Sequence, residues 1–147
     1  MADATAGTLR RVQEIYAEYA RGNRAFALDA LAPDVIWTSV AERPALPWSG
    51  TWRGRAEVEA YFAELDRLVA ITAYAIERYV ADGDCVVALA RAEGRFHTTG
   101  EAVVLNKADV LRLEAGRIIE FREYYDSALL LGCVARCGLA KPEETPA

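Results

Sequence analysis

Histidine is nearly absent from this chain of 147 residues: His97 is the only one. A single histidine excludes metal sites built on two histidines, and it confines any histidine-based catalytic triad to one position. Positive charge is also in the minority, because 17 lysines and arginines stand against 22 aspartates and glutamates, for a net charge of −5. Nucleic acid is therefore not an expected partner, since its binding depends on an excess of positive charge.

Cysteine and long apolar runs are scarce. Cys85, Cys133 and Cys137 are odd in number and show no CxxC spacing, a pattern that predicts free packed thiols in a reducing compartment. The longest apolar runs, 85–90 and 128–135, are far shorter than the ~20 residues of a membrane-spanning helix. The first residues contain no apolar signal core. The expectation is a cytoplasmic protein with no membrane contact.

The motifs of nucleotide-binding and of serine-dependent hydrolytic enzymes are missing too. The chain contains no GxxxxGK[ST] or GxGxxG, which bind phosphates, and no GxSxG nucleophile elbow. Neither a cofactor nor a metal is expected.

What is present fits one ordered domain, with 53% hydrophobic and 27% charged residues. Apolar residues at helical spacing predict helices over about 8–21, over a short segment that Asn23 caps, and over about 55–69. Between the second and third helices, 34–40 alternates as a strand does. An irregular loop with exposed or pocket-lining tryptophans is expected over 41–54.

After the third helix the apolar period changes from 3.6 to 2. Four strands are predicted, at about 72–81, 85–96, 102–113 and 117–126, joined by short hairpin turns. Helices followed by an antiparallel meander make an α+β fold. His97 lies next to one of these turns and is expected at the surface.

Two carboxylates stand in apolar rows of the last two predicted strands: Glu123 beside Phe121, and Asp109 beside two leucines. If a three-residue loop joins the strands, Asp109 lies opposite Phe121 and diagonal to Glu123, ~7–8 Å away at the backbone. Two carboxylates in one apolar surrounding are expected to have raised pKa values, as acids and bases working at neutral pH require. The same register places Lys107 opposite Glu123, and an ordinary ion pair, or a bulge that turns a side chain to water, is the competing explanation.

A set of aromatic residues, with one serine, is the second candidate feature. It comprises Tyr19, Trp37, Ser39, Trp48, Trp52, Phe62, Phe121 and Tyr125. Apolar walls with a few polar groups are typical of a small-molecule site, and these residues are the predicted substrate pocket. Filling of the core is the alternative explanation. The alternating Arg91, Glu93 and Arg95 are expected on the other face of the sheet, toward solvent or another subunit.

This order of elements resembles the NTF2-like superfamily, and within it the SnoaL-like group of small cone-shaped proteins. The resemblance is carried by YAEYARGN at 16–23, LAPDVIW at 31–37, GRAEVEAYF at 54–62, DGD at 82–84 and GRIIEFREYYD at 116–126.

The resemblance implies three N-terminal helices packed on a curved antiparallel sheet over 8–131. An N-terminal tail, 1–7, and a C-terminal extension, 132–147, would flank this domain. It also implies a homodimer formed through the outer face of the sheet. The superfamily contains isomerases, cyclases, hydrolases, dehydratase-like enzymes and binding modules, so the fold by itself names no reaction.

Family roles transfer to particular residues. In SnoaL-like polyketide cyclases the catalytic aspartate lies on the last strand, in a motif like the REY at 122–124, and Glu123 matches it as the longer acid. Their pocket histidine corresponds to Asp109, where ketosteroid isomerases place a hydrogen-bond-donating acid. The isomerases' base aligns with Ser39 and their tyrosine with Ile15, which argues against that reaction. Limonene-epoxide hydrolases share the acid at Glu123, but their Arg-x-Asp pair falls on two alanines.

Two hypotheses follow. The first is a cofactor-independent cyclase, isomerase or lyase of the SnoaL-like type, acting on a small, largely apolar carbonyl compound. Glu123 would be the acid/base, and a protonated Asp109 would donate a hydrogen bond to the enolate. The second is a non-catalytic module that binds an apolar or aromatic ligand. A cavity bearing both carboxylates, with Lys107 turned away, favours the first, and a filled interior or a tight Lys107–Glu123 pair favours the second.

Overall fold

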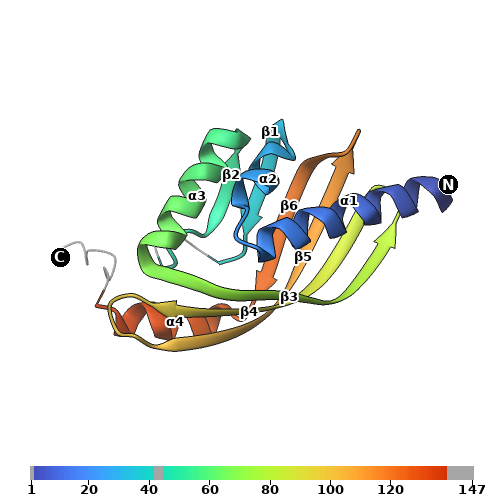
Figure 1. The fold of residues 1–147 in the computed structure, drawn as a ribbon. Helices are drawn as coiled ribbons and strands as arrows, with labels where there is room; N and C mark the ends of the chain where they lie inside the picture. The colour runs from blue at the N-terminus through green and yellow to red at the C-terminus, as the bar shows by residue number, and fades with distance from the viewer. Residues whose placement is uncertain (1, 42–44, 139–147) are drawn as a thin grey trace.

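The computed structural model describes residues 2–41 and 45–138. In chain order its elements are α1 (Ala2–Ala20), α2 (Arg24–Asp29), β1 (Leu31–Ser39), β2 (Gly50–Arg53), α3 (Gly54–Leu68), β3 (Val69–Asp82), β4 (Cys85–Phe96), β5 (Ala102–Glu114), β6 (Arg117–Tyr125) and α4 (Ser127–Arg136). The strands form one sheet in the order β2-β1-β6-β5-β4-β3. Figure 1 shows this sheet curving beneath α1, α2 and α3. The predicted α+β fold is confirmed, with one correction: β1 and β6 pair in parallel.

The first helix is longer than predicted. Helix α1 begins at Ala2, so residues 2–7, predicted as a tail, are helical. Alanine has the highest helix propensity, and the hydroxyl of Thr8 donates to the carbonyl of Ala4 at 2.8 Å. The helix ends at Ala20, and the turn that follows contains Gly22, whose φ of +86° is accessible to glycine at little cost.

The second helix begins where predicted and ends at Asp29. The Asn23 side chain accepts a hydrogen bond from the backbone N–H of Phe26, as a helix cap does. Strand β1 then starts at Leu31, before the predicted residue 34, and its register shifts between Leu31 and Ile36. This irregularity accommodates Pro33, which has no N–H for a regular ladder.

The predicted loop over 41–54 contains strand β2, which pairs with β1; its residues 42–44 lie outside the described part of the chain. Trp48 and Trp52 are both buried and so are not exposed loop tryptophans. The pairing places Trp52 opposite Trp37. Burial of these large rings explains why a segment rich in turn residues still forms a strand.

The β5–β6 hairpin sets the positions of the two carboxylates. Its turn is two residues long, Ala115 and Gly116, and both have positive φ angles, +50° and +76°, as a tight hairpin turn requires. A register shift next to Leu113 then changes the pairing by one residue. Asp109 therefore lies directly opposite Glu123, and the predicted three-residue loop and diagonal arrangement are wrong.

Two further predicted pairs change for the same reason. Lys107 lies opposite Tyr125 instead of Glu123, and Phe121 lies opposite Leu111. The inward orientation of the carboxylates was predicted correctly, because the alternation within each strand does not depend on the turn.

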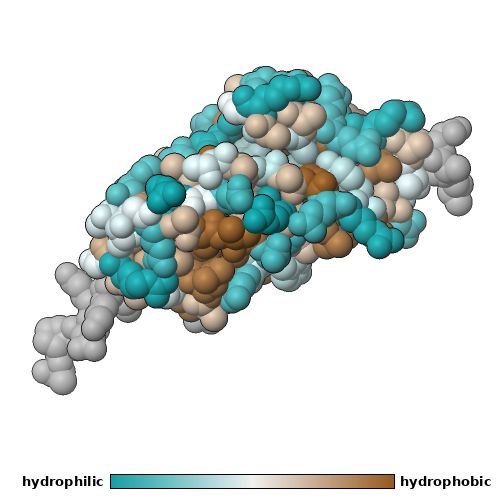
Figure 2. Space-filling view, turned by 60° about the horizontal axis from the view of Figure 1, so that its bottom comes forward, coloured by the Kyte–Doolittle hydropathy of each residue, from teal (hydrophilic) through white to brown (hydrophobic). Residues whose placement is uncertain are grey.

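The outer face of the sheet is mixed in character. Arg91 and Arg95 are exposed there, as predicted. Exposed apolar residues accompany them, among them Leu89, Val104 and Tyr124, and Figure 2 shows an apolar area on the underside of the molecule. The homodimer through this face remains a prediction. None of the helices in the described part of the chain is long and apolar enough to cross a membrane.

Candidate active site

An apolar cavity of about 110 Å³ lies between the helices and the concave face of the sheet. Six of the predicted pocket residues line it: Tyr19, Trp37, Trp48, Phe62, Phe121 and Tyr125. The other two support the wall from behind. Ser39 hydrogen-bonds Glu123, and the indole N–H of Trp52 donates to the carbonyl of Trp48 at 2.9 Å. The two predicted catalytic carboxylates line the same cavity.

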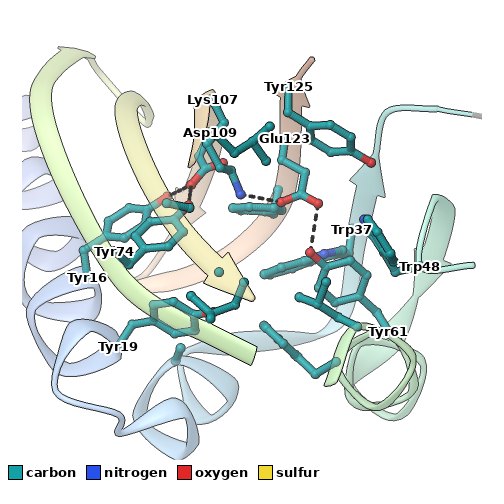
Figure 3. Close-up of a pocket in the computed structure, with 18 of the residues that line it drawn as sticks. Tyr16, Tyr19, Trp37, Trp48, Tyr61, Tyr74, Lys107, Asp109, Glu123 and Tyr125 are labelled. Carbon is teal, nitrogen blue, oxygen red and sulfur yellow. Dashed lines mark hydrogen bonds and ion pairs between the residues drawn. The ribbon is translucent and has the colours of Figure 1, made fainter. Parts of the chain in front are cut away.

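The two carboxylates share one ammonium group (Figure 3). Asp109 and Glu123 are both almost completely buried. The Lys107 Nζ lies 2.6 Å from Glu123 Oε2 and 3.2 Å from Asp109 Oδ1. The ion pair expected as a competing explanation for Glu123 is therefore present, and it includes Asp109 as well.

Four hydroxyl groups complete the cluster. Glu123 Oε1 accepts from the Ser39 hydroxyl at 2.6 Å and from the Tyr61 hydroxyl at 2.8 Å. Asp109 Oδ2 accepts from the hydroxyls of Tyr16 and Tyr74, each at 2.6 Å. These bonds link α1, α3, β1 and β3 to the two central strands, so the carboxylates are held from several sides.

Three of these residues, Tyr16, Tyr61 and Tyr74, were missed as site residues in the sequence. The first two stand in apolar helical stripes, where a tyrosine fits the pattern as a phenylalanine would. A usable signal existed, because a buried tyrosine hydroxyl normally needs a hydrogen-bond partner. Tyr16 also follows Ile15, the position aligned with the isomerases' tyrosine, and it brings a hydroxyl to Asp109 from the next residue of the helix.

The two oxygens of Asp109 differ in their surroundings. Oδ2 receives both tyrosine hydroxyls, whereas Oδ1 has only the ion-pair contact with Lys107 and no hydrogen bond of good geometry among the described residues. Since Oδ2 is already occupied by two O–H donors, a proton on Asp109 belongs on Oδ1. That oxygen is the one that could donate to a bound molecule.

Burial and charge set the protonation states of the cluster. Burial raises the pKa of Asp109, Lys107 opposes this rise, and Glu123 adds to it. For Lys107 burial acts to lower the pKa, but the two carboxylates outweigh it and the pKa lies well above its usual range. Burial also raises the pKa of Tyr16, Tyr61 and Tyr74 far above the usual value. The cluster thus has a permanent ammonium, permanent hydroxyl donors and one carboxyl with an upward shift.

The raised pKa of Asp109 predicts a pH dependence of stability. Unfolded aspartate loses its proton near pH ~3.9, while folded Asp109 keeps it to higher pH. Between these values the folded state binds more protons, so the free energy of unfolding falls as pH rises through the window. Asp109→Asn should remove this fall, because asparagine binds no proton in this range. Urea unfolding from pH 4 to 7 measures it, and parallel curves for the two proteins would contradict the shift.

The remaining titratable candidates lie elsewhere. His97 is exposed, and its Nε2 lies 2.8 Å from the carbonyl of Asp66, outside the cavity. Cys133 and Cys137 are buried and Cys85 is half-buried, all as free thiols, as predicted. Within the described residues, no three histidine, cysteine, aspartate or glutamate side chains gather closely enough to hold a metal ion.

Comparisons with known proteins agree with this architecture. The family model of the SnoaL-like domain matches residues 12–121. An NTF2-like protein of unknown function from Burkholderia pseudomallei is 27% identical, with a TM-score of 0.80 over 86% of this chain and 96% of that chain.

Two further solved structures are similar to this chain over most of its length. An NTF2-like protein from Burkholderia thailandensis is 26% identical, with a TM-score of 0.77 over 86% of this chain and 96% of that one. An epoxide hydrolase of the LEH-like type from M. tuberculosis shares the fold at 19% identity, with a TM-score of 0.68 over 92% of this chain and 95% of that one. No curated protein matches the sequence.

Proposed function

The chain belongs to the SnoaL-like family, and we propose that its cavity binds a small, largely apolar carbonyl compound and catalyses proton transfer next to the carbonyl without a cofactor. One observation carries the proposal. Asp109 and Glu123 stand directly opposite each other in the wall of an apolar cavity. Carboxyl groups in such surroundings are the usual means of acid/base chemistry near neutral pH.

The two acids differ in the way that this reaction requires. Glu123 accepts from Lys107, Ser39 and Tyr61, contacts that suit a carboxylate, and it would take the proton from the carbon. Asp109, protonated on Oδ1, would donate a hydrogen bond to the oxygen as the enolate forms. Return of the proton from Glu123 to another carbon completes an isomerisation. In a cyclisation the enolate carbon forms a bond to a second carbonyl carbon of the same molecule, the C=O π bond of that carbonyl breaks, and its oxygen takes the proton from Glu123.

A second function is favoured by the ion pair itself. Nζ of Lys107 lies 2.6 Å from Glu123, and two hydroxyls occupy the other oxygen of Glu123. Donors thus occupy both oxygens of Glu123 and compete with a substrate for them, so a non-catalytic module that binds an apolar ligand is the alternative. Catalysis would require Glu123 to give up its contact with Lys107 when substrate binds.

Exchange of carbon-bound hydrogen separates the two functions. Cyclohexanone dissolved in D₂O loses its α-proton NMR signal slowly, and a protein that abstracts these protons should accelerate the loss. We expect exchange above the buffer rate with the wild-type chain. A thermal-shift screen of aromatic polyketides, terpenoids and small cyclic ketones would select further compounds for the same assay. Stabilisation by several compounds with exchange at the buffer rate for all of them would favour the binding module.

A further inference from the structure

The indole of Trp37 is held rigidly at the centre of the cavity wall. Its ring stacks on Phe121 with centroids 3.8 Å apart, and Tyr61 and Phe62 pack against it at 5.4 and 5.7 Å. Figure 3 places Trp37 facing the cavity, near Tyr61. With three aromatic neighbours and only 7% of its surface exposed, the ring has little freedom to turn.

The N–H group of this indole has no hydrogen-bond partner among the described residues. The other two tryptophans differ, because Trp52 donates to the carbonyl of Trp48 and the Trp48 side chain hydrogen-bonds to Tyr125. Buried indole N–H groups normally find a partner, and leaving one unsatisfied is costly. A phenylalanine would fill this position without that cost.

The neighbouring polar groups are already engaged with one another. The hydroxyls of Tyr16, Tyr61 and Tyr74 donate to carboxylates, and Lys107 contacts both acids. Among the described side chains that line the cavity, Trp37 is thus the one whose polar group has no hydrogen bond at all. A ligand that supplies an acceptor atom would satisfy it.

The charge of the site restricts the ligand further. Two carboxyl groups share the single ammonium of Lys107, so the cluster carries no surplus positive charge in either protonation state of Asp109. A ligand carboxylate would add a negative charge beside Glu123 without a cation to compensate, which is unfavourable in a buried site. The cavity therefore suits an uncharged molecule.

We infer that the cavity selects a neutral molecule of about one ring whose oxygen accepts a hydrogen bond from the indole N–H of Trp37, and that it rejects carboxylates. The volume sets an upper limit on size: about 110 Å³ is of the order of the ~150 Å³ of an apolar cavity that admits benzene, so a single ring is the largest core that the cavity accommodates without movement of its walls. The inference rests on the proposed function only in that a ligand occupies the cavity, and it makes Trp37 a specificity-determining residue whether or not catalysis follows.

Three matched probes test this inference: cyclohexanone, its isostere methylenecyclohexane, and cyclohexanecarboxylate at pH 8. The ¹⁵N–¹H spectrum of the wild-type chain contains the three indole signals, and Trp37→Phe identifies that of Trp37. We expect cyclohexanone to shift the Trp37 signal while the Trp52 signal stays in place. The ketone should bind about 2- to 12-fold tighter than the alkene, the range for one neutral hydrogen bond.

In Trp37→Phe the preference for the ketone should disappear, and the carboxylate should bind neither protein. Any of four results with wild type would overturn the inference. They are equal affinities for ketone and alkene, an unmoved Trp37 signal at saturation, tight binding of the carboxylate, and no binding of any probe. The wild-type titrations decide the matter even if the variant does not fold. Cyclohexanone exchange above the buffer rate with an unmoved Trp37 signal would refute this inference and leave the proposed function standing. A shifted signal without exchange would do the reverse.

Discussion

Replacing Lys107 by methionine is expected to lower the free energy of unfolding by about 3–5 kcal/mol at neutral pH, the usual result of removing one partner from a buried ion pair. The reason is that Asp109 and Glu123 are both buried and lose their one shared cation. The loss should shrink as pH falls, because protonation of the carboxyl groups removes the uncompensated charge. Urea unfolding at pH 7 and pH 5 measures both effects.

The matched control is Arg112→Met. Arg112 also contacts two carboxylates, Asp84 and Glu120, but 46% of its side chain is exposed. Exposed ion pairs contribute roughly 0–1 kcal/mol, so this variant should remain close to wild type. Equal effects of the two substitutions would contradict the account of the buried cluster.

Replacing Glu123 by glutamine should reduce the exchange of cyclohexanone by about 10²- to 10⁴-fold, the contribution typical of a positioned acid or base. Glutamine keeps the size of the side chain and an oxygen that Ser39 and Tyr61 can reach, but it cannot accept a proton from carbon. Stability should change much less than activity, since the ammonium of Lys107 retains Asp109 as a partner.

The control on the same strand is Glu120→Gln. Glu120 pairs with Arg112 outside the cavity, so the exchange rate should be unchanged. Survival of activity within about tenfold in Glu123→Gln would remove Glu123 from the role of base. Loss of activity in both variants would indicate a general effect on the fold instead.

The sequence predicts the fold well because its apolar periods are clear. The change from helical to alternating spacing identifies the helices and the four long strands, and the inward orientation of Asp109 and Glu123 follows from alternation alone. Six of the eight predicted pocket residues line the cavity. The local patterns thus identify which side chains face inward.

The sequence does not predict the strand register or the contacts between distant elements. The register depends on the backbone conformation of single residues in the turn. Ala115 adopts a positive φ angle, which is uncommon for alanine, and this two-residue turn with the adjacent shift determines that Asp109 faces Glu123. Tyr16 and Tyr74 come from elements remote in sequence, so their convergence on Asp109 depends on the curvature of the sheet. Strand alternation likewise does not predict which groups the end of a long side chain such as Lys107 contacts.

The most direct test of the central claim, that this buried cluster serves proton transfer, is the double variant Lys107→Met/Glu123→Gln. This variant leaves Asp109 buried without its cation, but it also removes the charge of Glu123, so its free energy of unfolding should lie between those of Lys107→Met and wild type. We expect this folded protein to exchange the α-protons of cyclohexanone at the buffer rate, while wild type exceeds that rate. Exchange by the double variant within about tenfold of wild type would contradict the account.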